Sequence, residues 1–110
     1  MRVMIMVTMM TEDNFNILSP AETERLAILA EEMGEALQVI GKILRHGYES
    51  VNPTLPENEQ TTNREDLTYE LGHVEYAISL MVAGKDIQRE FIDTSRSEKV
   101  FTILEWIHHN

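Results

Sequence analysis

One glutamate lies where the sequence pattern predicts an apolar helix face, and it constrains the possible folds more than any other residue. The segment around it has a helical period, and at about 100° per residue Leu67, Val74 and Ala77 gather on one side. Glu70 projects from the middle of that side, with His73 one turn further along at its edge. Burying a carboxylate without a partner costs on the order of several kcal/mol. The fold must therefore bring a compensating group to Glu70.

A run of carboxylates lies upstream, where residues 31–35 read EEMGE. Residues three apart on a helix project together, so Glu32 pairs with Glu35 in the same way as Glu70 pairs with His73. If the two helices pack antiparallel, these four side chains converge on one centre. Carboxylates of like sign do not neutralise one another, so a cation is the natural partner of this group.

Oxygen-rich sites suit Mg²⁺ or Mn²⁺, and an imidazole moves the preference toward Mn²⁺ or another transition metal. Such ions bind substrate phosphates and neutralise charge that develops on phosphoryl oxygens. One alternative is that residues 31–35 form a solvated acidic stripe and that His73 only makes a structural hydrogen bond. Another is a buried ion pair of Glu70 with Lys42 or Arg45.

The composition excludes several classes of protein. Nine Lys and Arg residues against 19 Asp and Glu residues give a formal net charge of −10. A nucleic-acid-binding surface needs a basic footprint, so we expect no nucleic-acid partner. The chain has no cysteine, which excludes a thiolate zinc site and is compatible with the cytoplasm, where we expect the protein.

The first ten residues are strongly apolar, with five methionines among them. A membrane span needs roughly 20 residues, and the segment lacks the small-residue cleavage site of a signal peptide. We therefore expect no membrane contact and interpret residues 1–18 as an N-terminal arm or a short strand. The length of 110 residues suits a single domain with a modest core, which we place at residues 19–110.

Two helix starts are marked by capping boxes. In the first, Ser19 precedes a proline and is followed three residues later by Glu22, and the helical pattern then runs to Arg45. Gly47 is a plausible stop. The second box, at residues 62–65, opens a helix that we expect to end near Ala83, with Gly84 as its cap.

Residues 47–62 contain two prolines and little periodicity, so we expect a connecting loop long enough to suggest a role in ligand binding. A third helical pattern follows from Lys85. Its polar stretch at residues 93–99 is either an exposed part of one long helix or a break between two. The fold class that these patterns predict is an all-α bundle of three to five helices.

Four residues near the carboxylates are candidates for binding an anionic substrate. Lys42 and Arg45 follow Glu35 near the same edge of the first helix. Asn63 and Arg64 begin the second helix, where exposed backbone N–H groups favour anions. The alternative for Lys42 and Arg45 is that they balance acidic neighbours and the C-terminus of their helix.

The two acidic motifs resemble those of a known family. Glu-Glu-x-x-Glu on one helix and Glu-x-x-Asp on the next are the signature of the MazG-type all-α nucleoside triphosphate pyrophosphohydrolases. This chain reads EEMGE at 31–35 and ELGH at 70–73, and the resemblance covers residues 20–84. Three further segments resemble the small phage-type members, namely residues 42–50, 62–65 and 106–110. Some of these members, called MazZ, prefer dGTP and serve phages that replace adenine with 2-aminoadenine.

The resemblance implies a reaction and roles for individual residues. The family cleaves a nucleoside triphosphate between its α and β phosphates, giving the monophosphate and pyrophosphate, and dGTP or GTP is the expected substrate here. Glu32, Glu35 and Glu70 would bind Mg²⁺ or Mn²⁺, with Glu31 orienting or activating the attacking water. The resemblance also implies MazG-like packing completed in a homodimer or homotetramer, and the host cytoplasm as the location of a phage-encoded member.

The chain departs from the family pattern in two places. His73 stands where the family has an aspartate, which removes one negative charge and can change the metal preference. The interval between the motifs is longer by most of residues 47–62, which belong to base recognition or are an insertion. Two other functions stay open: hydrolysis of phosphoribosyl-ATP by the same chemistry, and a non-catalytic helical interaction protein with a relict acidic site.

Overall fold

The computed structural model describes residues 14–109, and in this range the chain is entirely helical. Three α-helices, α2 (Pro20–His46), α3 (Asn63–Ala83) and α4 (Arg89–Ile103), are accompanied by two short 3₁₀ helices, η1 (Asn14–Asn16) and η2 (Glu57–Glu59). The all-α prediction is confirmed. The predicted arm or strand at 1–18 lies mostly outside the described residues, and the part inside them begins with η1.

Both predicted capping boxes are present. At the start of α2, the Glu22 N–H donates to Ser19 Oγ at 3.1 Å, and the Ser19 N–H donates to Glu22 Oε1 at 2.8 Å. Thr62 and Glu65 make the equivalent pair of bonds at the start of α3. The predicted ends are also confirmed, since α2 stops at Gly47, whose φ of 90° suits glycine, and α3 stops at Gly84.

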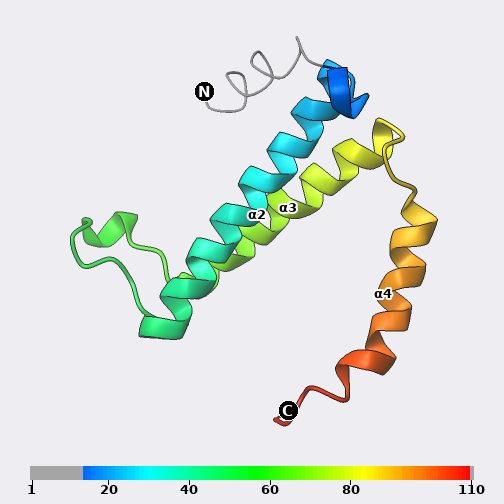
Figure 1. Cartoon of the computed structure of the whole chain (residues 1–110). Coiled ribbons are helices and arrows are strands. Elements are labelled where there is room, and N and C mark those ends of the chain that lie inside the picture. Colours follow the sequence, from blue (N-terminus) through cyan, green and yellow to red (C-terminus); the bar gives the residue numbers. More distant parts are fainter. Residues whose placement is uncertain (1–13, 110) are drawn as a thin grey trace.

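Helices α2 and α3 form an antiparallel hairpin, seen as the cyan and the yellow-green helices of Figure 1. Its core is small and consists of Ala36 and Val39 from α2 with Ala77 and Met81 from α3. Small side chains at Ala36 and Ala77 let the two helices approach closely. The hairpin therefore places residues from the middle of α2 opposite residues from the middle of α3.

An ion pair closes the end of the hairpin that is remote from residues 47–62. The Arg25 guanidinium donates to both Asp86 carboxylate oxygens, at 2.6 and 2.8 Å. A Cβ atom at Gly84 would lie 2.5 Å from Arg25 Cζ, so a larger residue there would displace the guanidinium from this position. Gly84 thus both ends α3 and admits the arginine.

Helix α4 extends away from the hairpin and makes no comparable packing contact with α2 or α3 in the described part of the chain (Figure 1). It continues through the polar stretch at residues 93–99, so the first of the two predicted alternatives is right. Packing of three or more helices into a bundle is therefore not seen among residues 14–109. Among residues 14–109, no helix combines the length and the hydrophobicity that crossing a membrane requires.

Candidate metal centre

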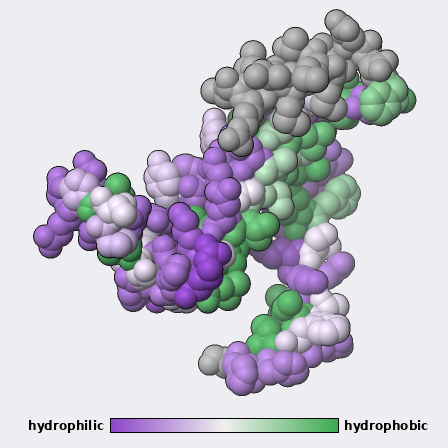
Figure 2. Space-filling view, turned by 60° about the vertical axis from the view of Figure 1, so that its left-hand side comes forward, coloured by the Kyte–Doolittle hydropathy of each residue, from purple (hydrophilic) through white to green (hydrophobic). Residues whose placement is uncertain are grey.

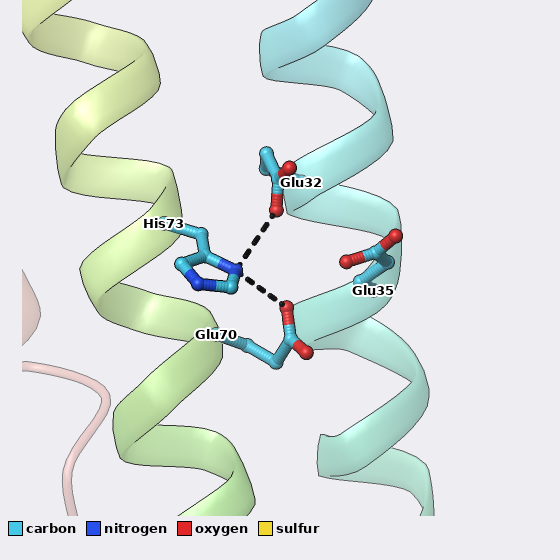
Figure 3. Close-up of side chains that lie close together, drawn as sticks. All are labelled: Glu32, Glu35, Glu70 and His73. Carbon is cyan, nitrogen blue, oxygen red and sulfur yellow. Dashed lines mark ion pairs between the residues drawn. The ribbon is translucent and has the colours of Figure 1, made fainter. Parts of the chain in front are cut away.

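Four side chains converge at the middle of the α2–α3 seam, as Figure 3 shows. Glu32 and Glu35 come from α2, and Glu70 and His73 come from α3. One possible ligand atom from each residue lies within 4.8 Å of the others. The three-residue spacing on each helix and the antiparallel packing produce this convergence, as the sequence pattern predicts.

Within this cluster two carboxylate oxygens are left without a hydrogen bond. Glu32 Oε2 and Glu70 Oε2 are buried, and neither has a hydrogen-bond partner. The nearest basic nitrogen is His73 Nδ1, at 3.4 Å from the first oxygen and 3.5 Å from the second. Charge-assisted hydrogen bonds from nitrogen to carboxylate are normally about 2.7–2.9 Å long. The imidazole therefore faces both oxygens without satisfying either.

The electrostatics of the cluster also indicate that a compensating positive charge is missing among the described residues. Burial raises the pKa of the Glu70 carboxyl group, and so do the neighbouring carboxyl groups of Glu35 and Glu32. His73 opposes this change, but the net direction is upward. A raised pKa means that the site disfavours the ionised form of Glu70 when no compensating cation is present.

A divalent cation fits this set of donors. Three carboxylates and one imidazole match the ligands of Mg²⁺ and Mn²⁺, with the nitrogen favouring Mn²⁺. Such an ion would give the two buried oxygens the partner that they lack. The alternative ion pair of Glu70 with Lys42 or Arg45 is not formed among the described residues, where the basic side chain beside Glu70 is the imidazole of His73.

The remaining predicted catalytic residue, Glu31, is not part of the converging group. It is exposed on α2, whereas Glu32 and Glu35 are half-buried. This difference follows from helix geometry, because Glu31 is turned by about 100° from Glu32 and so leaves the seam. Its predicted role with the attacking water stays a prediction.

Three of the four predicted substrate-binding residues line one open pocket. Lys42, Arg45 and Asn63 border a cavity of about 640 Å³ between the end of α2, the following loop and the first turn of α3. Arg64 does not line it. Its guanidinium instead forms an exposed ion pair with Glu49 at 2.7 Å and lies 4.3 Å from the centre of the Tyr48 ring.

The first turn of α3 differs from the expectation in one respect. The Asn63 N–H donates to the Ser50 carbonyl at 3.0 Å, and the Arg64 N–H donates to the Tyr48 carbonyl at 2.9 Å. The backbone N–H groups that we expected to face an anion are therefore already used within the chain. The buried Asn63 side chain also donates to the Gly47 carbonyl at 3.1 Å, so it holds the loop against α3.

The sequence analysis did not single out Asp66, which lines the same pocket. A signal was present, because Asp66 precedes Glu70 by four residues and so lies on the same helix face. Ser50 and Thr61 line the pocket as well. Their position depends on the path of the loop, which no helical period predicts.

Models of known protein families, curated proteins and solved structures were each compared with this chain, and none of them matches it.

Proposed function

We propose that this protein is a metal-dependent nucleoside triphosphate pyrophosphohydrolase. The observation that carries the proposal is the pair of buried, partnerless oxygens on Glu32 and Glu70, which lie together with Glu35 and His73. This arrangement supports a cation site better than a solvated acidic stripe does, because a solvated stripe leaves no carboxylate oxygen buried without a partner. The motif resemblance described above supplies the reaction class.

In this proposal Glu32, Glu35, Glu70 and His73 hold Mg²⁺ or Mn²⁺. When bound, such an ion neutralises charge on the phosphoryl oxygens and lowers the pKa of a nearby water. Glu31, exposed beside the cluster, accepts a proton from the water that attacks the α phosphorus. The bond from the α phosphorus to the bridging oxygen breaks, and pyrophosphate leaves the nucleoside monophosphate.

Lys42 and Arg45 serve as the phosphate contacts. Lys42 lies seven residues beyond Glu35, which is about 10 Å along the helix at 1.5 Å per residue. In the described part of the chain, neither Lys42 nor Arg45 forms an ion pair with a carboxylate, whereas Arg25 and Arg64 do. The charges of Lys42 and Arg45 are therefore available to a substrate. We propose dGTP or GTP as the substrate on the basis of the resemblance.

The proposal includes a second copy of the chain. Only four apolar side chains of the described residues are buried, while Leu37 and Leu44 on α2 are 68% and 82% exposed. Helix α4 and the residues after it expose Phe101 and Trp106. Figure 2 shows apolar residues, in green, at the surface along the helices. Such surfaces are typical of interfaces, which supports a homodimer or homotetramer.

A product assay tests the reaction. Each dNTP and NTP, and phosphoribosyl-ATP, is incubated with the protein and Mg²⁺ or Mn²⁺, and monophosphate and pyrophosphate are quantified. We expect equal amounts of the two products, with no nucleoside diphosphate and no turnover in EDTA. Absence of turnover with every nucleotide would overturn the proposal and favour a non-catalytic interaction protein.

Two variants connect the activity to the site. Glu35→Gln should abolish turnover, whereas Glu75→Gln, which makes the same change at an exposed position of α3, should not alter it. His73→Asp should shift the preference from Mn²⁺ toward Mg²⁺, because it replaces a nitrogen ligand by an oxygen ligand. Full activity of Glu35→Gln would contradict the assignment of the site.

A further inference from the structure

The pocket near the candidate metal centre is lined by residues that do not belong to that centre. It has a volume of about 640 Å³ and lies between the end of α2, residues 50–55 and 61, and the first turn of α3. Within the motif resemblance, most of this loop is additional chain. Its purpose is therefore a question that the resemblance does not answer.

The chemistry of the pocket changes from one side to the other. On the α2 side it is bordered by Lys42 and Arg45. The Arg45 side chain folds back along α2, so that Nη1 lies 3.5 Å from the position that a Cβ of Gly41 would take. On the loop side the walls include the apolar Val51 and Leu55. A ligand with an anionic end and a planar, partly apolar end would match this arrangement.

We propose that this pocket holds the base of the nucleotide and that Asp66 selects bases that carry an exocyclic amino group. The proposal rests on the proposed function, because that function places the phosphates at the metal centre. Asp66 lies four residues before Glu70, about 6 Å along α3. The ribose and the base ring together span more than this, and a metal ion would lie between Glu70 and the phosphate, so one nucleotide can reach both residues.

The contacts of Asp66 position its carboxylate as a hydrogen-bond acceptor that can distinguish one base from another. Its Oδ1 accepts a hydrogen bond from Thr61 Oγ1 at 2.6 Å, which holds the carboxylate at the pocket wall. An ionised carboxylate only accepts hydrogen bonds, so it needs N–H donors on the base. Guanine, adenine and cytosine carry an amino group on their pairing edge. Thymine and uracil carry no amino group there, and their single ring N–H is flanked by two carbonyl oxygens, which the carboxylate repels.

Asp66→Asn tests the inference, because it keeps the size of the side chain and an oxygen for Thr61 but replaces one acceptor by a donor. We measure kcat and KM for dGTP, dATP, dCTP and dTTP. The ratio of kcat/KM for the preferred amino-bearing substrate to that for dTTP should fall by about tenfold or more, mainly through KM. Glu75→Gln removes the same charge from an exposed position of α3 and should leave the ratio unchanged.

A binding experiment separates failure of this inference from failure of the proposed function. Amide NMR spectra are recorded with dGMP, dAMP, dCMP and dTMP in EDTA. We expect shifts at residues 50–55 and 61–66 with the preferred amino-bearing monophosphate, weaker shifts with dTMP, and loss of this difference in Asp66→Asn. Equal or absent responses at these residues, or an unchanged kcat/KM ratio in Asp66→Asn, would overturn the inference even if triphosphates are hydrolysed.

Discussion

Asp86 and Glu70 are buried to a similar degree, but only Asp86 has a cation of the chain in contact with it. Their side chains are 12% and 19% exposed. The hydrogen bond from Arg25 lowers the pKa of Asp86, and the charge of the guanidinium acts in the same direction. Burial raises the pKa of Glu70, whose nearest neighbours include two further carboxylates. Similar burial thus gives opposite shifts, and the partner decides the sign.

The comparison shows which of the two regions is complete. At the Arg25–Asp86 end of the hairpin, two hydrogen bonds satisfy the charge, and the pair stabilises the fold without a ligand. In the middle of the seam, the cluster around Glu70 holds three carboxyl groups, and among the described residues no Lys or Arg pairs with any of them. A poorly exposed carboxylate without a local cation is typical of a site that binds one.

The largest expected effect is on activity. Glu70→Gln should lower kcat/KM for the triphosphate by on the order of 100-fold or more, because it removes a charged ligand from the centre. Asp86→Asn should retain most of the activity, since Asp86 touches no part of the centre. Steady-state pyrophosphate release measures both. Comparable losses in the two variants would remove the distinction between the two regions.

The next effect concerns stability with added metal. Mn²⁺ at 100 times its dissociation constant should stabilise the fold by about 2.7 kcal/mol, or on the order of 10 °C in Tm. Asp86→Asn should show the same increase, and Glu70→Gln should show little. Thermal unfolding followed by circular dichroism, with and without Mn²⁺, gives these values. An equal increase in Glu70→Gln would place the ion elsewhere.

A smaller effect is expected without metal. Asp86→Asn should lower Tm by roughly a few degrees, because it leaves Arg25 without its charged partner. Glu70→Gln should leave Tm unchanged or raise it, because it removes a carboxylate that has no cation. Unfolding in EDTA tests the pair of variants. A clear loss of stability in Glu70→Gln would mean that the carboxylate is already compensated within the chain.

The smallest effect is the pH dependence of the metal-free protein. The raised pKa of Glu70 means that the folded state binds this proton more tightly, so stability should fall as pH rises from the ordinary value of 4.5. Asp86, whose pKa is lowered, should contribute stability above its ordinary value of 3.8 and lose it as pH falls. Urea unfolding in EDTA at a series of pH values measures both slopes.

The variants assign these slopes. Glu70→Gln should remove the decline above pH 4.5, and Asp86→Asn should reduce the loss at acid pH. A decline that persists in Glu70→Gln would belong to another group. If Glu70 and Glu35 share one proton, Glu35→Gln should shift the decline in stability to a different pH and should not remove it.

The local structure could be predicted closely because it depends on neighbours in the sequence. The capping boxes at Ser19 and Thr62 and the glycines after both helices define α2 and α3, since caps act within one helical turn. The candidate metal-binding group was predictable for the same reason. Two pairs at three-residue spacing can converge when the two helices pack antiparallel.

The pocket contacts were less predictable, because they depend on how a loop without a period returns to α3. Asn63 was expected to offer its N–H to an anion, but that group bonds to the Ser50 carbonyl. Arg64 was expected near the substrate, yet it pairs with Glu49 outside the pocket. Neither contact follows from helical spacing, since each joins residues that lie more than ten positions apart.

By itself, the sequence determined that the chain is helical, where α2 and α3 begin and end, and which four residues could share a cation. These properties rest on backbone capping and on side-chain periodicity, which act over a few residues. Only the tertiary structure decided that Glu32 and Glu70 have buried oxygens without partners. It also decided that Arg25 pairs with Asp86 and not with either of these glutamates. Charge compensation requires contact between groups far apart in the chain, and only the packing of α2 against α3 creates or withholds that contact.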